Sequence, residues 1–304
     1  MIKDPLACGD LLADRRYAYA RAAAEEGDWR AAAEVLEQVL ERAPDWPPAW
    51  FALGEARERL GETAGAAEAF LATLRADPSD AQGAAARLAL LGAAEAPKSL
   101  PRAYVARLFD DYAPRFEAHL TGALAYRAPT LVVDALDRLD GARRFARSLD
   151  LGCGGGLMGA ALRGRVDRLF GVDLSPAMIA KARATGRYDA LEVGEAVEFL
   201  ARRERGDFDL VVAADVLVYF GDLAEVAASA ARALAPGGLF AFTVEAFEGE
   251  GFRLGPTMRF AHSRAHLRAA AAAAGLRPLA LLDASTRREA GRDVPGLIGV
   301  FAAP

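Results

Sequence analysis

Lysine and cysteine are both scarce in this sequence of 304 residues. Lysine occurs only at Lys3, Lys98 and Lys181, so arginine carries almost all of the positive charge, and the formal net charge is −5. A chain with net negative charge has no field that attracts a polyanion, so nucleic acid is not expected as a partner. The two cysteines, Cys8 and Cys153, are too few for a disulfide framework or a thiolate metal site.

Long apolar runs are also missing. No stretch approaches the roughly 18 uninterrupted apolar residues of a membrane-spanning helix, and the first five residues do not have the pattern of a signal peptide. We therefore expect a cytoplasmic protein with no membrane segment. The chain is longer than one typical domain of about 100–200 residues, which predicts two domains. No cluster of histidine, cysteine and carboxylate residues predicts a metal site.

The first third of the sequence is a repeat. Gly27-Asp28-Trp29 and Gly61-Glu62-Thr63 are 34 positions apart, as are Pro44 and Pro78. This is the period of the tetratricopeptide repeat, in which each copy is a pair of helices. The stretch from Asp80 to Leu91 is expected as a further helix that caps the stack, because one apolar face would otherwise be exposed.

A glycine-rich turn near the middle of the chain follows a short apolar strand. It contains Asp150-Leu151-Gly152-Cys153-Gly154, and a second strand that ends at Asp173 follows it. This order of elements is typical of an adenosine-binding α/β fold, in which the second acidic side chain receives the ribose hydroxyls. Glycine is needed in the turn because a Cβ would hold the ligand away from the backbone.

Two classes of cofactor compete for this turn. Gly154, Gly156 and Gly159 form a G-x-G-x-x-G pattern, which is found in nicotinamide and flavin dinucleotide sites. However, Asp150 lies two residues before Gly152, and a carboxylate there would repel a pyrophosphate. It suits a ligand with a cationic end, and S-adenosylmethionine carries a sulfonium and an ammonium but no phosphate. The residues therefore favour S-adenosylmethionine.

Five segments in order resemble the motifs of class I S-adenosylmethionine-dependent methyltransferases. The glycine turn and Gly171-Val172-Asp173-Leu174-Ser175 resemble the first two motifs. The third, fourth and fifth motifs have counterparts, in this order, in residues 192–196, 208–215 and 234–238. With its N-terminal repeats, the whole chain resembles a group of bacterial methyltransferases that carry tetratricopeptide repeats.

The resemblance implies the fold and its boundaries. Residues 1–92 are expected to form an all-α helical-repeat domain, 93–100 a linker, and 101–304 a Rossmann-like α/β methyltransferase domain with a seven-stranded, mostly parallel sheet. The sixth strand is expected from Leu276 to Asp283, followed by a polar turn from Thr286 to Asp293. The last strand, Gly296 to Ala302, is expected to be antiparallel.

The resemblance also implies the cofactor site. Gly152 and Gly154 would pass under the methionine part, Asp173 would hold the ribose, and Glu195 would lie beside the adenine amine. The complete set of implied cofactor-binding residues is Tyr112, Arg127, Asp150, Gly152, Cys153, Gly154, Asp173, Leu174, Met178, Glu195, Ala196, Ala214 and Asp215.

An aromatic, helical stretch precedes the glycine turn. The resemblance implies that its helices close over the cofactor, with Tyr112 facing it and Arg127 paired with the methionine carboxylate in a bidentate way. Inside the turn, Cys153 is expected to be a small filler and not a catalytic thiol.

Catalytic candidates come from the ends of the fourth and fifth strands. Methyl transfer is an in-line displacement, so the site must hold the nucleophile behind the C–S bond, and a general base is needed only for a weakly acidic acceptor. The candidates there are Asp215, Tyr219, Glu245 and the stretch from Arg259 to Ser263. Of these, Tyr219 and His262 are the expected catalytic residues, His262 because the pKa of a free imidazole is about 6.5. Ser263 is also expected as an N-cap, in which case His262 flanks a helix. His266 and the pair Arg287-Arg288 are expected at the surface.

Three functions remain open. The first is a methyltransferase that acts on an O, N or C atom of a small molecule and releases S-adenosylhomocysteine. The second is a protein methyltransferase that recruits its target through the repeats, which are also candidates for self-association. The third is a non-enzymatic scaffold that binds the cofactor. No Pro-Cys pair is present, which excludes methylation of cytosine at C5.

Overall fold

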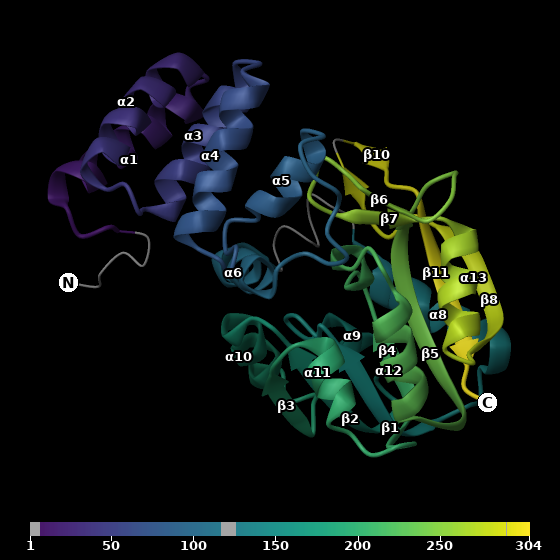
Figure 1. Ribbon diagram of the computed structural model, residues 1–304. Helices are drawn as coiled ribbons and strands as arrows, with labels where there is room; N and C mark the ends of the chain where they lie inside the picture. Colours follow the sequence, from purple (N-terminus) through teal and green to yellow (C-terminus); the bar gives the residue numbers. More distant parts are fainter. Residues whose placement is uncertain (1–6, 117–125, 290) are drawn as a thin grey trace. The chain divides into compact units, whose positions relative to one another are not determined.

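The computed structural model describes residues 7–116, 126–289 and 291–304. The chain divides into two compact units, Met1–Tyr104 and Val105–Pro304 (Figure 1). Among the described residues, no helix is both long and apolar enough to cross a membrane.

The first unit consists of helices, which confirms the predicted helical repeats. The two pairs are α1 (Leu11–Glu25) with α2 (Trp29–Arg42), and α3 (Pro47–Arg59) with α4 (Thr63–Ala76). The final helix, α5 (Ala84–Leu90), packs on α4 but begins later than Asp80. Asp80 adopts a left-handed backbone conformation with φ of 52°, and its carboxylate caps α5 by accepting from the Ala84 amide at 2.6 Å.

Small residues allow these helices to approach one another closely. A Cβ built on Gly54 of α3 would lie 2.5 Å from the Cε1 atom of Phe70 in α4. Phe70 is fully buried, in a cluster with Ala66, Ala84 and Leu88. The ring therefore has no room to move aside, and glycine is required where α3 crosses α4.

The second unit is built on one sheet with the strand order β3-β2-β1-β4-β5-β11-β8. These strands are β1 (Phe145–Leu151), β2 (Val166–Asp173), β3 (Ala190–Val193), β4 (Phe208–Ala213), β5 (Leu234–Ala246), β8 (Arg277–Ala284) and β11 (Gly296–Ala302). β1 to β5 pair in parallel, whereas β11 is antiparallel to both of its neighbours. This arrangement confirms the predicted Rossmann-like sheet with an antiparallel last strand.

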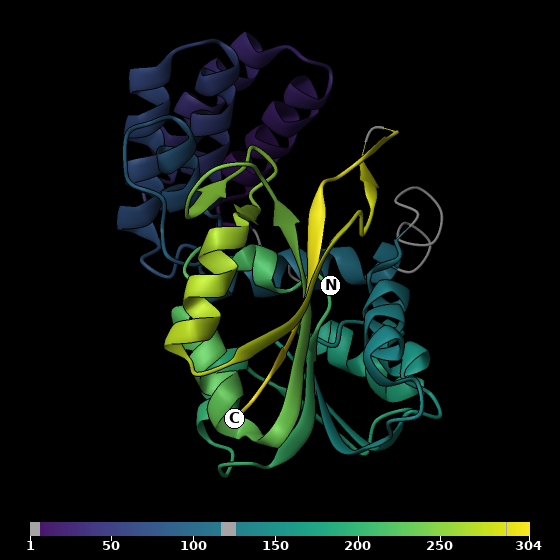
Figure 2. The same cartoon turned by 90° about the vertical axis from the view of Figure 1, so that its right-hand side faces the viewer.

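Helices cover both faces of the sheet. One face carries α11 (Ala196–Ala201), α12 (Ala224–Ala233) and α13 (Arg264–Ala273), and the other carries α8 (Ala128–Asp140) and α9 (Leu157–Ala161). Figure 2 shows α12 and α13, in green to yellow-green, and the blue-green α8 on opposite sides of the sheet. Two further helical elements, α6 (Arg102–Tyr112) and η1 (Ala113–Arg115), precede α8, and α10 (Pro176–Ala184) follows β2.

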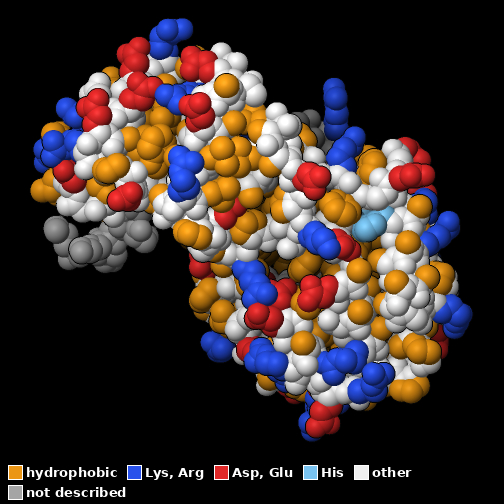
Figure 3. Space-filling view, in the orientation of Figure 1, with side chains coloured by type: hydrophobic (Ala, Val, Ile, Leu, Met, Phe, Trp, Pro, Cys, Tyr) orange, Lys and Arg blue, Asp and Glu red, His pale blue; other side chains and the backbone are white. Residues whose placement is uncertain are grey.

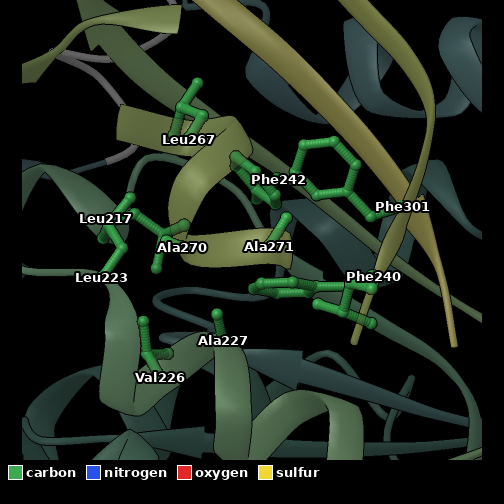
Figure 4. Close-up of a pocket in the computed structure, with 11 residues that line it drawn as sticks. Leu217, Leu223, Val226, Ala227, Phe240, Phe242, Leu267, Ala270, Ala271 and Phe301 are labelled. Atoms are coloured by element: carbon green, nitrogen blue, oxygen red, sulfur yellow. The ribbon is translucent and has the colours of Figure 1, made fainter. Parts of the chain in front are cut away.

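A small apolar void lies in the core between α12, α13 and strands β5 and β11 (Figure 4). Its free volume is about 10 Å³, and its walls are entirely apolar, with Phe240, Phe242 and Phe301 on the strand side. A dry void of this size is no larger than the space for one water molecule. It is a packing imperfection and does not contribute to the site described below.

Two short hairpins add to the expected topology. β6 (Phe252–Leu254) pairs with β7 (Phe260–His262), and β7 continues the sheet by pairing with β5. β9 (Arg288–Glu289) pairs with β10 (Arg292–Asp293), within the segment expected to be only a polar turn. Both hairpins therefore supply ordered backbone near the end of β5.

We predict that Gly54→Ala destabilises the first unit by about 1–3 kcal/mol, because the new methyl group overpacks against the immobile Phe70 ring. The three tryptophans of the chain, Trp29, Trp46 and Trp50, all lie in the first unit. Tryptophan fluorescence during urea unfolding therefore reports on this unit selectively.

The matched control is Gly65→Ala in α4. Its Cβ would meet only the flexible side chain of Arg57, at 3.1 Å, so the better helix propensity of alanine should stabilise the unit by up to about 1 kcal/mol. Equal effects of the two substitutions would show that the α3–α4 crossing does not require glycine.

Candidate functional site

The candidate site lies at the carboxyl ends of the parallel strands. The strand order reverses between β1 and β4, and ligands of such sheets bind at this reversal. Asp150 is the penultimate residue of β1, Asp173 ends β2, and Asp215 follows β4. The fold therefore brings together acidic residues that are far apart in the sequence.

The glycine turn after β1 is closely covered by other side chains. Gly152 has φ of 62°, and a Cβ on it would lie 2.5 Å from the Cγ2 atom of Val216. Gly154 has φ of 51°, and a Cβ on it would lie 3.3 Å from the Cζ atom of Phe116. Glycine is therefore needed at both positions for the backbone conformation and for the close approach.

The Asp173 carboxylate is held by two backbone amides. Its Oδ2 atom accepts a hydrogen bond from the Gly154 amide and its Oδ1 atom accepts from the Ser175 amide, both at 2.9 Å. Burial raises the pKa of this carboxyl. Each oxygen has two lone pairs, so each keeps capacity for one more donor. The carboxylate therefore fits a vicinal diol.

Asp150 is a buried acid that has one phenolic partner. The side chain is 1% exposed, and its Oδ2 atom accepts from the hydroxyl of Tyr188 at 2.7 Å. Burial raises the pKa of Asp150 to about 7; the Tyr188 hydrogen bond partly opposes this shift, and the nearby charge of Asp173 adds to it. A cationic ligand group beside Asp150 would offset the cost of burying the carboxylate. The pair of acids fits S-adenosylmethionine better than a pyrophosphate.

The other predicted cofactor residues follow the carboxyl ends of β1 to β4 or lie in the helices after them. Glu195 caps α11 by accepting from the Glu198 amide at 2.8 Å. Met178 is fully buried in α10. Cys153 is 5% exposed, and burial raises the pKa of its thiol, which suits a small filler. The remaining positions, Leu174, Ala196 and Ala214, directly follow or precede site residues along the chain.

Tyr112 and Arg127, the two cofactor residues predicted in the stretch before the glycine turn, lie in different surroundings. Tyr112 at the end of α6 packs edge-on against Phe116, with ring centroids 5.4 Å apart, and so belongs to the aromatic cover of the turn. The Arg127 side chain is exposed, and its guanidinium donates to the Ser285 carbonyl at 3.1 Å. Its pairing with a methionine carboxylate stays a prediction.

A network of charged side chains lies beyond Asp215. Arg259, just before β7, donates to the Oδ1 atom of Asp215 at 2.6 Å, to the hydroxyl of Tyr219 at 3.1 Å, and to Glu245. Arg287 donates to the Oε1 atom of Glu245 at 2.7 Å. We call Asp215, Tyr219, Glu245, Arg259 and Arg287 the ion network.

The ion network is shielded from water. The side chains of Arg259 and Arg287 are 13% and 6% exposed, so the expectation of a surface position is wrong for Arg287. Burial by itself would lower the pKa of Arg259, but the neighbouring acidic groups, Asp215 first among them, raise it well above its ordinary value. The backbone at Asp215 is left-handed, with φ of 63°, which costs of order 1 kcal/mol at a non-glycine residue and is common at functional sites.

The His262 ring is held by the backbone of the segment after β4. It is fully buried on β7, and its Nε2 atom lies 2.8 Å from the Phe220 carbonyl. Burial lowers the pKa of its imidazole to about 4. The His266 ring stacks on that of His262, with ring centroids 5.6 Å apart, and bonds to the Gly221 carbonyl, so it is half-buried at the surface. The geometry gives both rings a structural role, and the catalytic role of His262 stays a prediction.

Asp150→Asn tests the burial of the carboxyl. The folded protein holds the Asp150 proton up to a pH of about 7, whereas the unfolded chain loses it near a pH of about 4. Stability should therefore fall as the pH rises from about 4 to about 7, by on the order of 1–4 kcal/mol, and the Asn variant should lack this loss.

The measurement is chemical unfolding of the second unit at several pH values, followed by circular dichroism. Asp167→Asn is the control, because Asp167 lies on the neighbouring strand β2 but its side chain is 55% exposed and pairs with Arg144. The same pH dependence in the wild type and the Asp150→Asn variant would contradict the account.

Two family models match the chain. A methyltransferase domain matches residues 149–242, and a tetratricopeptide repeat matches residues 17–81. The ubiquinone biosynthesis O-methyltransferase of Xanthomonas oryzae pv. oryzae is 35% identical over 96 residues, which is 31% of this chain and 40% of that protein. The human methyltransferase-like protein 27 is 38% identical over 106 residues, 34% of this chain and 43% of that protein. The matches thus span about two fifths of each relative.

Solved structures agree with the fold. The complex between the Haloferax volcanii Trm112 methyltransferase activator and a methyltransferase matches with a TM-score of 0.52 and 22% identity, covering 64% of this chain and 97% of that chain. The [4+2]-cyclase SpnF matches with a TM-score of 0.54 and 21% identity, covering 66% and 95%. The family models show that the chain joins N-terminal tetratricopeptide repeats to a methyltransferase domain, and the solved structures share the fold of that domain.

Proposed function

We propose that this protein transfers a methyl group from S-adenosylmethionine to a small molecule. The observation that carries the proposal is the pair of buried acids at the ends of β1 and β2. Asp173 keeps a free lone pair on each oxygen for the ribose hydroxyls, and Asp150 offers a buried negative charge to the cationic end. When bound, the cofactor supplies an activated methyl group on sulfur.

The ion network is our candidate for the acceptor site. Among the described residues, all hydrogen bonds to the carboxylates of Asp215 and Glu245 end on one oxygen of each, Oδ1 and Oε1. The second oxygens can accept from an O–H or N–H group of an acceptor. Arg259 and Arg287 already have anionic partners within the network, so we do not expect these arginines to bind an anionic acceptor. It therefore favours a hydroxyl or amine acceptor.

The relatives are consistent with a small acceptor. One of them is named as an O-methyltransferase of ubiquinone biosynthesis, and that name supports a hydroxyl acceptor without identifying the compound. On the face seen in Figure 3, acidic and basic side chains are interspersed, unlike the one-signed surface that a nucleic-acid substrate requires.

A protein acceptor is the second candidate, favoured by the match of residues 17–81 to a tetratricopeptide repeat. Repeats of this kind present concave surfaces for partner segments. The cyclase with the same fold also makes clear that the fold by itself does not require methyl transfer.

The test uses methyl-labelled S-adenosylmethionine and a cell extract separated by size. We predict that label moves into small molecules, and that Asp173→Asn lowers this transfer at least about tenfold, because it removes a charge-assisted acceptor worth about 1.5–3 kcal/mol. Asp167→Asn, which changes an exposed carboxylate on β2, should keep the wild-type rate.

Other outcomes separate the candidates. Label on a protein band would favour the second candidate, and deletion of residues 1–92 should then abolish the transfer. Binding of the cofactor without any transfer, across extracts from several growth conditions, would contradict both and support a non-enzymatic role.

A further inference from the structure

Asp110 in α6 connects the leading helices to the cofactor turn. Its Oδ1 atom accepts hydrogen bonds from the Ser175 hydroxyl at 2.5 Å and from the Ala177 amide at 3.2 Å. The two partners lie at the start of α10, 65 and 67 positions further along the chain. Neither the sequence motifs nor the matched relatives assign a role to Asp110.

Ser175 links Asp110 to Asp173, the carboxylate that we propose binds the ribose. Ser175 is fully buried, and its amide donates to the Oδ1 atom of Asp173 at 2.9 Å. Its hydroxyl oxygen accepts from the Met178 amide at 3.0 Å as the N-cap of α10, while its hydroxyl proton is donated to Asp110. The hydrogen bonds thus run without a gap from the Gly154 amide through Asp173 and Ser175 to Asp110.

The segment that carries Asp110 also covers the glycine turn. Phe116, directly after η1, lies over Gly154 and packs in a cluster with Ala113 and the fully buried Met178 of α10. Phe109, one position before Asp110, contacts the Phe116 ring edge-on at 6.4 Å. The segment from α6 to Phe116 is therefore held at two points, by Asp110 at the start of α10 and by Phe116 at the turn.

We propose that Asp110 is a positioning residue for cofactor binding, which it serves by fixing Ser175 and, through it, the orientation of Asp173. This inference rests on the proposed use of S-adenosylmethionine. Without Asp110, the buried hydroxyl proton of Ser175 and the amide of Ala177 lose their acceptor, so the start of α10, including the Ser175 amide, is held less firmly. The Asp173 carboxylate then loses a fixed neighbour, so that more of the cofactor's binding energy is used to order the site.

The test is calorimetric titration of S-adenosylhomocysteine into the full chain. We expect Asp110→Ala to weaken binding about 5- to 20-fold. Asp110→Asn should stay within about threefold of the wild type, since an amide oxygen can accept the same two hydrogen bonds. Asp111→Ala is the matched control: Asp111 is the next residue of α6, its side chain is 69% exposed, and it forms a loose ion pair with Arg107 at 3.9 Å. It should bind within about twofold of the wild type.

A double-mutant cycle separates positioning from general support of the fold. If Asp110 acts through Asp173, the Asp110→Ala substitution should cost less than about twofold in affinity once Asp173 is already replaced by Asn. An equal loss in both backgrounds would show that Asp110 only supports the fold, and would overturn the proposal. Should Asp110→Ala fail to fold, Ser175→Ala breaks the same connection and should give the same non-additive loss.

The outcomes also distinguish this inference from the proposed function. A wild-type protein that does not bind S-adenosylhomocysteine contradicts both. A wild type that binds, together with an Asp110→Ala variant that binds equally well, contradicts only the role of Asp110.

Discussion

The site depends on the burial of two carboxylates at the ends of adjacent parallel strands. Asp150 and Asp173 are 1% and 8% exposed. Burial raises the pKa of both carboxyls, and the nearby charge of Asp173 adds to the shift at Asp150. The second unit compensates with directed donors: the Tyr188 hydroxyl for Asp150, and two backbone amides for Asp173. Full compensation requires a ligand that brings a cation to one acid and hydroxyls to the other.

The surrounding elements can be understood as supports for this pair. Glycines 152 and 154 permit the turn, Ser175 ties Asp173 to α10, and Asp110 ties α10 to α6. On the other side, the ion network joins the ends of β4 and β5 to the β6–β7 hairpin and to Arg287. Its two arginines and two acids, with side chains 6–17% exposed, balance in charge, which leaves the free carboxylate oxygens as the polar groups offered to an acceptor.

The sequence predicts elements whose signals are local. The apolar runs that form β1, β4 and β11, the 34-residue period of the repeats, and the Ser263 cap of α13 are all recovered in the structure. Contacts between distant residues leave no such signal. Tyr188 reaches Asp150 across 38 positions, and Arg287 reaches Glu245 across 42. The sequence predicts a surface position for Arg287, because two adjacent arginines in a polar segment are usually solvated. In the structure, Arg287 lies just before β9 and is buried, whereas Arg288 on β9 is exposed.

We propose that the glycine turn selects S-adenosylmethionine over a dinucleotide. The most direct measurement is calorimetric titration of the full chain with S-adenosylhomocysteine and, separately, with NADH. The account predicts saturable binding of S-adenosylhomocysteine at a pH of about 8, where Asp150 is ionised, and no binding of NADH at the same concentrations. Binding of NADH without binding of S-adenosylhomocysteine would contradict it, because a pyrophosphate would then be accepted beside the Asp150 carboxylate.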